Sequence, residues 1–136
     1  MISRLSHVSF FVLDQKSARD FYVNKLGFEI KKDIPVGDKR TWLTISPKGQ
    51  DIEITLIPVN TPLMFKPDTA EKLAELIRAM AFGYGVFECV DVYATYEELK
   101  GRGVEFIKIP TEGGGEPEAM FKDDSGNFFG LCQTKK

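Results

Sequence analysis

The sequence predicts an α+β fold in which a single domain contains two copies of a βαβββ module. The chain resembles itself at an offset of 77 residues, so that Phe10 aligns with Phe87 and Asp14 with Asp91. Each half also shows the same succession of β-branched or aromatic runs, a short helical segment and a glycine. The expected boundaries within the domain, 1–136, are module one at 4–58, a connecting loop and helix at 59–81, and module two at 82–134.

Each module is expected to begin with a strand and a helix. The opening strands are runs of β-branched and aromatic residues at 5–13 and 84–91. An aspartate follows each run, and Asp14 and Asp91 suit the N-cap of a helix because their carboxylates accept hydrogen bonds from free backbone N–H groups. The predicted helices cover 15–25 and 92–102.

Each module is expected to end with three strands. Gly27 and Gly103 stand where the helix ends, because glycine readily adopts the left-handed conformation of a helix C-terminus, and a second strand follows. Gly49 and Gly126 mark the turns of a hairpin in each module. The expected hairpin strands are 41–45 with 51–57 and 119–122 with 127–133, and the stretch 33–39 is expected to be irregular.

The composition argues against binding to nucleic acid or membranes. Eighteen Lys and Arg oppose twenty Asp and Glu, and the basic residues form no cluster of the kind that contacts phosphates. The chain has no apolar run long enough to span a bilayer, and we expect no N-terminal targeting segment. Cys89 and Cys132 lie in apolar runs, where we expect reduced, buried thiols. We therefore expect a cytoplasmic protein.

Four features together resemble the vicinal oxygen chelate superfamily, which includes glyoxalases, extradiol dioxygenases and bleomycin resistance proteins. They are the repeat, the Asp-x-x-x-Ala-x-x-Phe-Tyr helix start at Asp14, the Leu-Gly-Phe turn at Gly27 and the Asp-Ser-Gly-Asn hairpin at Gly126. The resemblance covers nearly the whole chain. It implies the glyoxalase/bleomycin resistance fold, in which eight strands curl into a cup with the helices outside and the ligand inside.

The resemblance also implies where a metal would bind. In the metalloenzymes of this superfamily, the metal ligands come from the first and fourth strands of each module. His7 and Glu53 match these positions in module one, whereas the 77-residue offset places Tyr84 and Gly130 there in module two. A catalytic divalent metal needs about three protein ligands, and the chain has a single histidine. We therefore expect a degenerate metal site and no cofactor, with a divalent metal as the alternative.

Strand alternation predicts which side chains line the cup, because residues two apart share a face. With His7 and Glu53 facing inward, the wall combines aromatic with polar side chains, as small-molecule sites do. The expected ligand-binding residues are His7, Ser9, Phe11, Trp42, Glu53, Thr55, Tyr84, Glu88 and Phe128. For Trp42 no motif determines whether the ring faces inward.

Each of these residues also has a purely structural interpretation. A lone histidine on a strand is often a hydrogen-bonded core residue, and Trp42 and Tyr84 could be packing residues. Glu53 is more informative because it interrupts an apolar strand, and burying a carboxylate without partners costs several kcal/mol. Its side chain must therefore face water, a partner or a ligand, and a water-filled cup would satisfy it as well.

Two functions remain open. The first is a metal-independent binding protein of the bleomycin resistance type, which sequesters a small organic molecule. The second is an enzyme, either a lyase or isomerase with Glu53 as general base and His7 as its partner, or a metal-dependent glyoxalase or dioxygenase. The resemblance also implies a homodimer, the commonest oligomer, in which modules pair within one chain or between two. The identity of the ligand is not in the sequence.

Overall fold

The computed structural model describes residues 1–37, 40–62, 64–82, 84–111 and 115–134, without the side chain of Tyr84. The chain divides into two compact units, Met1–Glu75 and Leu76–Lys136. Each unit contains one of the two predicted modules, and whether the two form a single domain stays a prediction. In the described part of the chain, no helix is long and apolar enough to cross a membrane.

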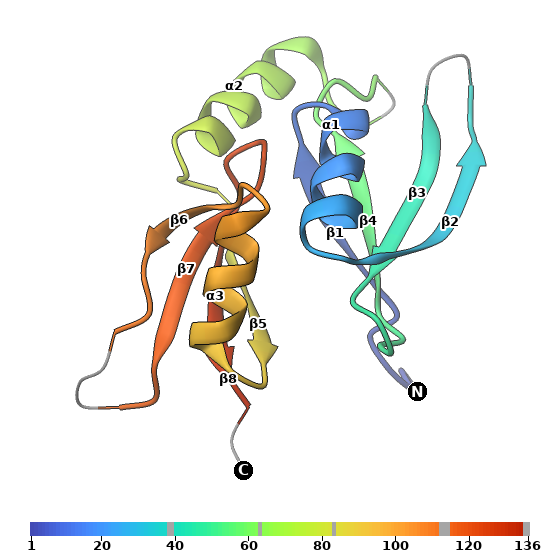
Figure 1. Cartoon of the computed structure of the whole chain (residues 1–136). Coiled ribbons are helices and arrows are strands. Elements are labelled where there is room, and N and C mark those ends of the chain that lie inside the picture. The colour runs from blue at the N-terminus through green and yellow to red at the C-terminus, as the bar shows by residue number, and fades with distance from the viewer. Residues whose placement is uncertain (38–39, 63, 83, 112–114, 135–136) are drawn as a thin grey trace. The chain divides into compact units, whose positions relative to one another are not determined.

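The first unit holds a mixed four-stranded sheet in the order β1-β4-β3-β2 (Figure 1). Strands β1 and β4 run parallel, and the other neighbours are antiparallel. Its elements are β1 (His7–Val12), α1 (Gln15–Asp20), the π-helical turn η1 (Phe21–Lys25), β2 (Glu29–Pro35), β3 (Thr41–Ser46) and β4 (Glu53–Pro58). Helix α2 (Pro67–Arg78) follows and contains the junction between the units.

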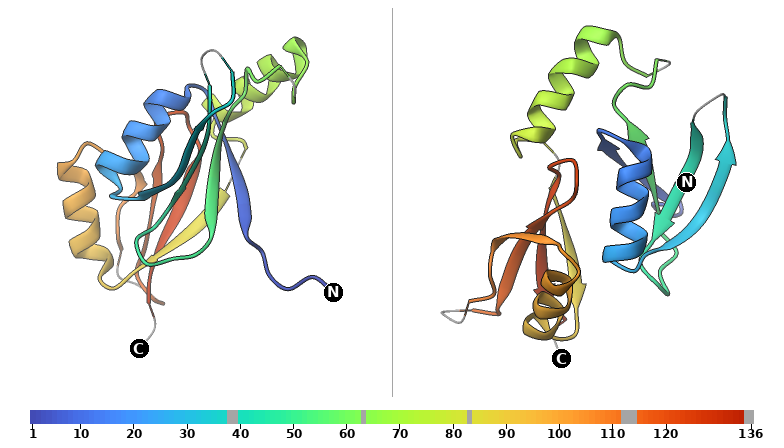
Figure 2. Two further views of the ribbon diagram at one scale, coloured as in Figure 1. Left: turned by 90° about the vertical axis from the view of Figure 1, so that its right-hand side faces the viewer. Right: turned by 45° about the horizontal axis from the view of Figure 1, so that its top comes forward.

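The second unit repeats this topology with the strand order β5-β8-β7-β6, and again its first and fourth strands are parallel. Its elements are β5 (Tyr84–Cys89), α3 (Val92–Gly101), β6 (Glu105–Lys108), β7 (Glu118–Lys122) and β8 (Phe128–Gln133). Figure 2 shows a helix lying along the sheet in each unit. The predicted α+β fold of two βαβββ modules is therefore confirmed.

Each module packs its helix on the apolar face of its sheet. In the first unit, Leu43, Ile45, Ile54 and Leu56 are buried on this face, and Phe10 contacts Tyr22 with ring centroids 6.0 Å apart. In the second unit Phe121, Phe129 and Leu131 are buried in the same way. Burial of such a side chain contributes about 1.5–3 kcal/mol, so the alternation of apolar residues along β4 and β8 determines which face meets the helix.

The helices α1 and α3 have the capping residues that the sequence predicted. The Asp14 carboxylate accepts a hydrogen bond from the Ser17 backbone N–H at 3.0 Å, and the Asp91 carboxylate accepts one from the Ala94 N–H at 3.1 Å. Gly27 and Gly103 have φ angles of 77° and 89°, in the left-handed region where a Cβ atom is strained. These four predictions are confirmed.

Two segments of module one differ from the prediction. The predicted helix 15–25 widens into a π-helical turn, in which the Leu26 N–H donates to the Phe21 carbonyl at 3.1 Å. The start of the stretch predicted to be irregular instead continues β2, where Asp33 pairs with Leu43 and Ile34 with Trp42. An edge strand tolerates such a polar, proline-terminated sequence because one side of its backbone is unpaired in the sheet.

The two cysteines are only half-buried, rather than buried as expected. Both are free thiols, and the Cys89 Sγ lies 3.5 Å from the Cys132 carbonyl oxygen. Partial burial raises the pKa of the Cys89 thiol above its ordinary value. A raised pKa lowers the thiolate fraction at neutral pH, which makes Cys89 a poor nucleophile.

Candidate functional site

The polar residues predicted from strand parity lie on one face of the first sheet, opposite the face that packs on α1. His7 pairs with Glu53 and Ser9 pairs with Thr55 across the parallel strands β1 and β4. His7 and Ser9 are exposed, Glu53 is half-buried and Thr55 is buried. The prediction that His7 and Glu53 lie side by side on neighbouring strands is confirmed. We call this surface the polar face.

Glu53 is the centre of a hydrogen-bonded cluster on the polar face. Its Oε1 accepts a hydrogen bond from the Thr44 hydroxyl at 2.7 Å. Its Oε2 lies 3.3 Å from the Nε2 of His7 and 3.5 Å from the Nζ of Lys32. The Nδ1 of His7 is 2.9 Å from the Ser6 hydroxyl, which holds the ring in place. Both oxygens of the carboxylate therefore have partners within the chain.

This cluster changes the acidity of Glu53. The hydrogen bond from Thr44 lowers the pKa of the carboxyl group below its ordinary value of 4.5, and the nearby charges of Lys32 and His7 lower it further, while burial opposes them. Since this pKa is below 4.5, Glu53 is ionised at neutral pH. The lowered pKa also makes the carboxylate a weaker base for the removal of a proton from carbon.

The structure determines the orientation of Trp42, which the sequence left open. Trp42 alternates with Leu43, whose side chain is buried in the core, and lies two residues from Thr44 on the same strand. Its side chain is therefore on the polar face, where it is 40% exposed. Phe11 is on this face too and contacts Phe65 edge to face, with centroids 5.4 Å apart.

Two members of the cluster, Thr44 and Lys32, were missed by the sequence analysis. Thr44 could have been found, because it is the polar residue between Leu43 and Ile45 on a strand paired with β4. Lys32 could not, because a bulge between Ile30 and Lys32 shifts the register of β2 by one residue. Without this bulge, Lys31 would occupy the position that faces Glu53.

In the second unit the structure corrects one predicted position. Tyr84 pairs with Phe128, and Gly130 pairs with Val86 instead. From His7 to Glu53 the sequence numbers differ by 46, but from Tyr84 to Phe128 they differ by only 44. The constant offset of 77 residues therefore assigned Gly130 as the counterpart of Glu53, two residues too far along β8. The counterpart in the structure is Phe128.

The remaining predicted residues of module two stay spread along its sheet. Phe128 is half-buried, and Glu88 is exposed and pairs with Cys132. Tyr84 is placed by its backbone register alone. The structure brings together His7, Glu53, Ser9 and Thr55 in module one, and it leaves their role in binding a ligand as a prediction.

The donor set of one chain does not fit a catalytic divalent metal. Among the described residues, no group of three or more His, Cys, Asp or Glu side chains could hold a metal ion. His7 and Glu53 supply two donors, fewer than the roughly three that a catalytic zinc-type site uses. The positions that would add donors from module two hold Tyr84 and Phe128.

Comparison with known proteins shows which family shares this architecture. The sequence profile of the Glyoxalase/Bleomycin resistance protein/Dioxygenase superfamily matches residues 4–131. The chain belongs to this superfamily. It is 36% identical over 129 residues to the uncharacterized protein YetH of Bacillus subtilis (strain 168), which covers 95% of this chain and 97% of YetH.

Solved structures with similar sequences share the fold. The crystal structure of UcmS2 is 41% identical with a TM-score of 0.91, and the match covers 98% of this chain and 100% of UcmS2. TnmS3, an antibiotic binding protein from Streptomyces sp. CB03234, is 30% identical with a TM-score of 0.74 and covers 98% of each chain. The superfamily and the fold predicted from the sequence are both confirmed.

Proposed function

We propose that this protein binds a small organic molecule against the polar face of its first module, without a metal and without chemical conversion. The observation that carries this proposal is the cluster around Glu53, whose two carboxylate oxygens are already held by Thr44, His7 and Lys32. A carboxylate held in this way, with a lowered pKa, is suited to orient polar groups of a ligand rather than to remove a proton.

The surroundings of the cluster favour a flat, partly apolar ligand. Trp42 offers a partly exposed indole ring on the same face. Stacking between aromatic rings stabilises a complex by about 0.5–1.5 kcal/mol in addition to the burial of their apolar surface. His7 and Lys32 add polar groups beside it. That TnmS3 is described as an antibiotic binding protein is consistent with such a ligand.

A fluorescence titration tests this proposal, because Trp42 is the only tryptophan of the chain. We expect saturable quenching of its emission by bleomycin or by a member of a panel of planar aromatic antibiotics. In calorimetry with the same compound, Trp42→Ala should weaken binding about tenfold. Val90→Ala, which removes an exposed apolar side chain of the second unit, should leave binding unchanged. Equal affinities of Trp42→Ala and the parent protein would contradict the proposal.

A lyase or isomerase that uses His7 and Glu53, with or without a divalent metal, is the second candidate, favoured by the 3.3 Å distance between His7 Nε2 and Glu53 Oε2 on adjacent strands. Elemental analysis of protein purified without chelator tests the metal-dependent form of this candidate. We expect no stoichiometric metal, and one nickel, zinc, iron or manganese per chain would overturn our preference. Half a metal per chain, lost in His7→Ala, would mean that two first modules join their His7 and Glu53 side chains around one ion.

We further propose that the protein acts as a homodimer in the cytoplasm. Two-fold homodimers are the commonest oligomers, and a second chain could supply the module that closes the polar face into a cup. Sedimentation equilibrium at micromolar concentration should give twice the chain mass of 15.3 kDa. A species of the single-chain mass alone would contradict this.

A further inference from the structure

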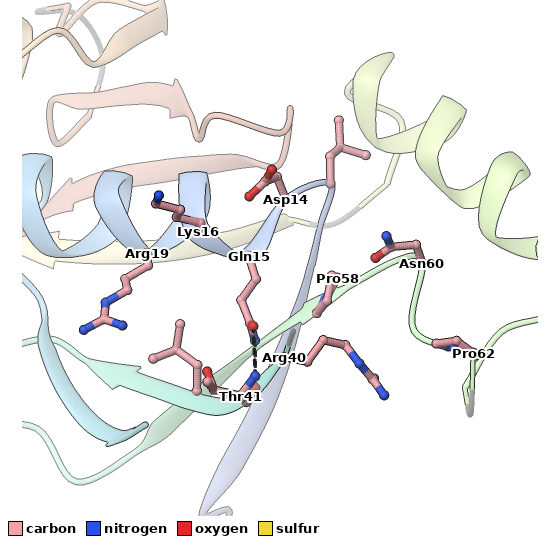
Figure 3. A pocket seen from close by; sticks show the side chains of 11 residues that line it. Asp14, Gln15, Lys16, Arg19, Arg40, Thr41, Pro58, Asn60 and Pro62 are labelled. Carbon is pink, nitrogen blue, oxygen red and sulfur yellow. Dashed lines mark hydrogen bonds between the residues drawn. The ribbon is translucent and has the colours of Figure 1, made fainter. Parts of the chain in front are cut away.

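We propose that module one carries a second ligand site, for an organic anion, in a hollow between α1 and the start of β3. The hollow has a volume of about 680 Å³ and lies entirely within the first unit (Figure 3). Small-molecule sites typically enclose about 300–1,000 Å³. Leu43 lines the hollow and points to the opposite side of the sheet from Trp42 and Thr44, so the hollow is distinct from the polar face.

Basic side chains dominate the charge of this hollow. Lys16, Arg19 and Arg40 line it together with one acidic residue, Asp14. The Asp14 carboxylate is engaged in capping α1, and Arg19 is paired with Asp33 at 2.7 Å. Lys16 and Arg40 form no ion pair among the described residues. Two cations thus remain available to an anion.

Arg40 is the group best placed to anchor the anion. It is half-buried, and in Figure 3 its side chain extends from the start of β3 on the side of Asn60 and Pro62. A half-buried guanidinium gains more from an anion than an exposed one, because the surrounding dielectric constant is lower. Its planar donors match the oxygens of a carboxylate, phosphate or sulfonate, and the Asn60 amide adds a further donor.

The apolar residues that line the hollow favour a ligand that also has an apolar part. Leu13 and Pro62 contribute apolar surface, and the buried residues Leu43 and Pro58 form the wall behind them. An inorganic anion would leave this surface in contact with water, whereas an organic anion covers it and gains about 25 cal/mol for each Å² removed from water. The hollow therefore suits a molecule that joins an apolar ring or chain to one acidic group.

A network at the base of the hollow holds it open before any ligand binds. The Gln15 side-chain amide donates to the carbonyls of Thr41 at 2.9 Å and Leu56 at 3.0 Å, and its oxygen accepts from the Thr41 N–H at 3.3 Å (Figure 3). These bonds link α1 to β3 and β4. A preformed wall reduces the ordering cost of binding.

The basic set is not a requirement of the βαβββ module. At the offset that relates the two helices, Lys16 corresponds to Tyr93 and Arg19 to Tyr96. Tyr96 packs on Phe106 with ring centroids 4.7 Å apart and so serves the core of module two. Module two therefore folds without cations at these positions, and because Arg19 is paired with Asp33 in module one, Lys16 is the cation that a ligand explains better than the fold.

Titration with 8-anilinonaphthalene-1-sulfonate, an aromatic anion, tests this site. We expect one saturable site per chain, with changes in amide chemical shifts at residues 13–19, 40–43 and 59–61. Arg40→Gln should weaken binding about tenfold, and Lys16→Gln should weaken it less, because Lys16 is exposed. The matched control is Arg102→Gln, which removes a guanidinium of the second unit paired with Glu98 and should leave the affinity unchanged.

The neutral analogue N-phenyl-1-naphthylamine separates the charge from the ring. We expect it to bind at least about tenfold more weakly than the sulfonate. Equal affinity of the neutral compound, an unchanged affinity in Arg40→Gln, or shift changes centred on Trp42 and Glu53 would each overturn the proposal. The last outcome would assign the probe to the polar face, so failure of this site is distinguishable from failure of the function proposed above.

Discussion

In module one the parallel pair of strands brings His7 beside Glu53, and in module two the same pair brings Tyr84 beside Phe128. The opposite faces of the two sheets remain alike, with buried apolar residues under a helix capped by an aspartate. Packing against the helix therefore requires apolar residues on one face of each sheet, whereas the fold tolerates different residues on the other face. Module one has a polar cluster there, and module two has an aromatic residue, Phe128, at the corresponding position of its fourth strand.

The largest contrast between the modules that a single substitution should reveal lies in the hairpin turns. Gly126 has a φ angle of 122°, and a Cβ atom there would lie 2.2 Å from the Ile77 carbonyl oxygen, whereas Gly49 has a φ angle of 80° and open space around it. We expect Gly126→Ala to lower the free energy of unfolding by about 3 kcal/mol or more, against about 1 kcal/mol for Gly49→Ala. Urea denaturation measures both, and equal losses would show that the turn of module two does not rest on α2.

The link between helix and sheet should come next in size. In module one the Gln15 side chain makes three hydrogen bonds to β3 and β4, while in module two the Gln133 side chain accepts one from the Val92 N–H at 3.0 Å. Because lost partners leave part-buried backbone groups unsatisfied, Gln15→Ala should cost about 2 kcal/mol and Gln133→Ala about 1 kcal/mol. Thermal or urea unfolding of the two variants provides the check. The reverse ranking would mean that water replaces the bonds of Gln15.

A designed pair of donors would sharpen the comparison between the two sheets. The register predicts that Tyr84→His with Phe128→Glu places a His beside a Glu in module two, as in module one. Tyr84→His with Gly130→Glu is the matched control, because Gly130 pairs with Val86. We expect calorimetry to show nickel binding at least about tenfold tighter in the first double variant. Tighter binding in the control would restore the assignment of Gly130 as the counterpart of Glu53.

The smallest expected effect concerns the acidity of Glu53. Since the Thr44 hydroxyl is the largest cause of its lowered pKa, Thr44→Val should raise this pKa toward the ordinary value, which an NMR titration of the side-chain carboxyl carbon would detect. Thr55→Val removes a hydroxyl from the same face and serves as control. A carboxyl with a lowered pKa in the folded state stabilises the protein fully above its ordinary pKa of 4.5, and this contribution is lost as the pH falls through the lowered value. In Thr44→Val that acid-induced loss should be smaller.

By itself, the sequence determined the features that depend on near neighbours. The aspartate caps, the left-handed glycines and the alternation that buries Ile54 and Leu56 were all predicted correctly, because each follows from a few consecutive residues and their local geometry. The position of His7 beside Glu53 followed from the repeat together with the resemblance to the superfamily.

Only the tertiary structure decided the features that depend on how distant strands pair. Module two has two residues fewer between its paired positions, so that the counterpart of Glu53 is Phe128 and not Gly130. The bulge in β2 places Lys32, rather than Lys31, beside Glu53. The burial of Leu43 and the contact of Thr44 with Glu53 likewise showed that the ring of Trp42 is on the polar face. A one-residue change in register reverses which face a side chain occupies, and nothing in the local sequence marks where such a change occurs.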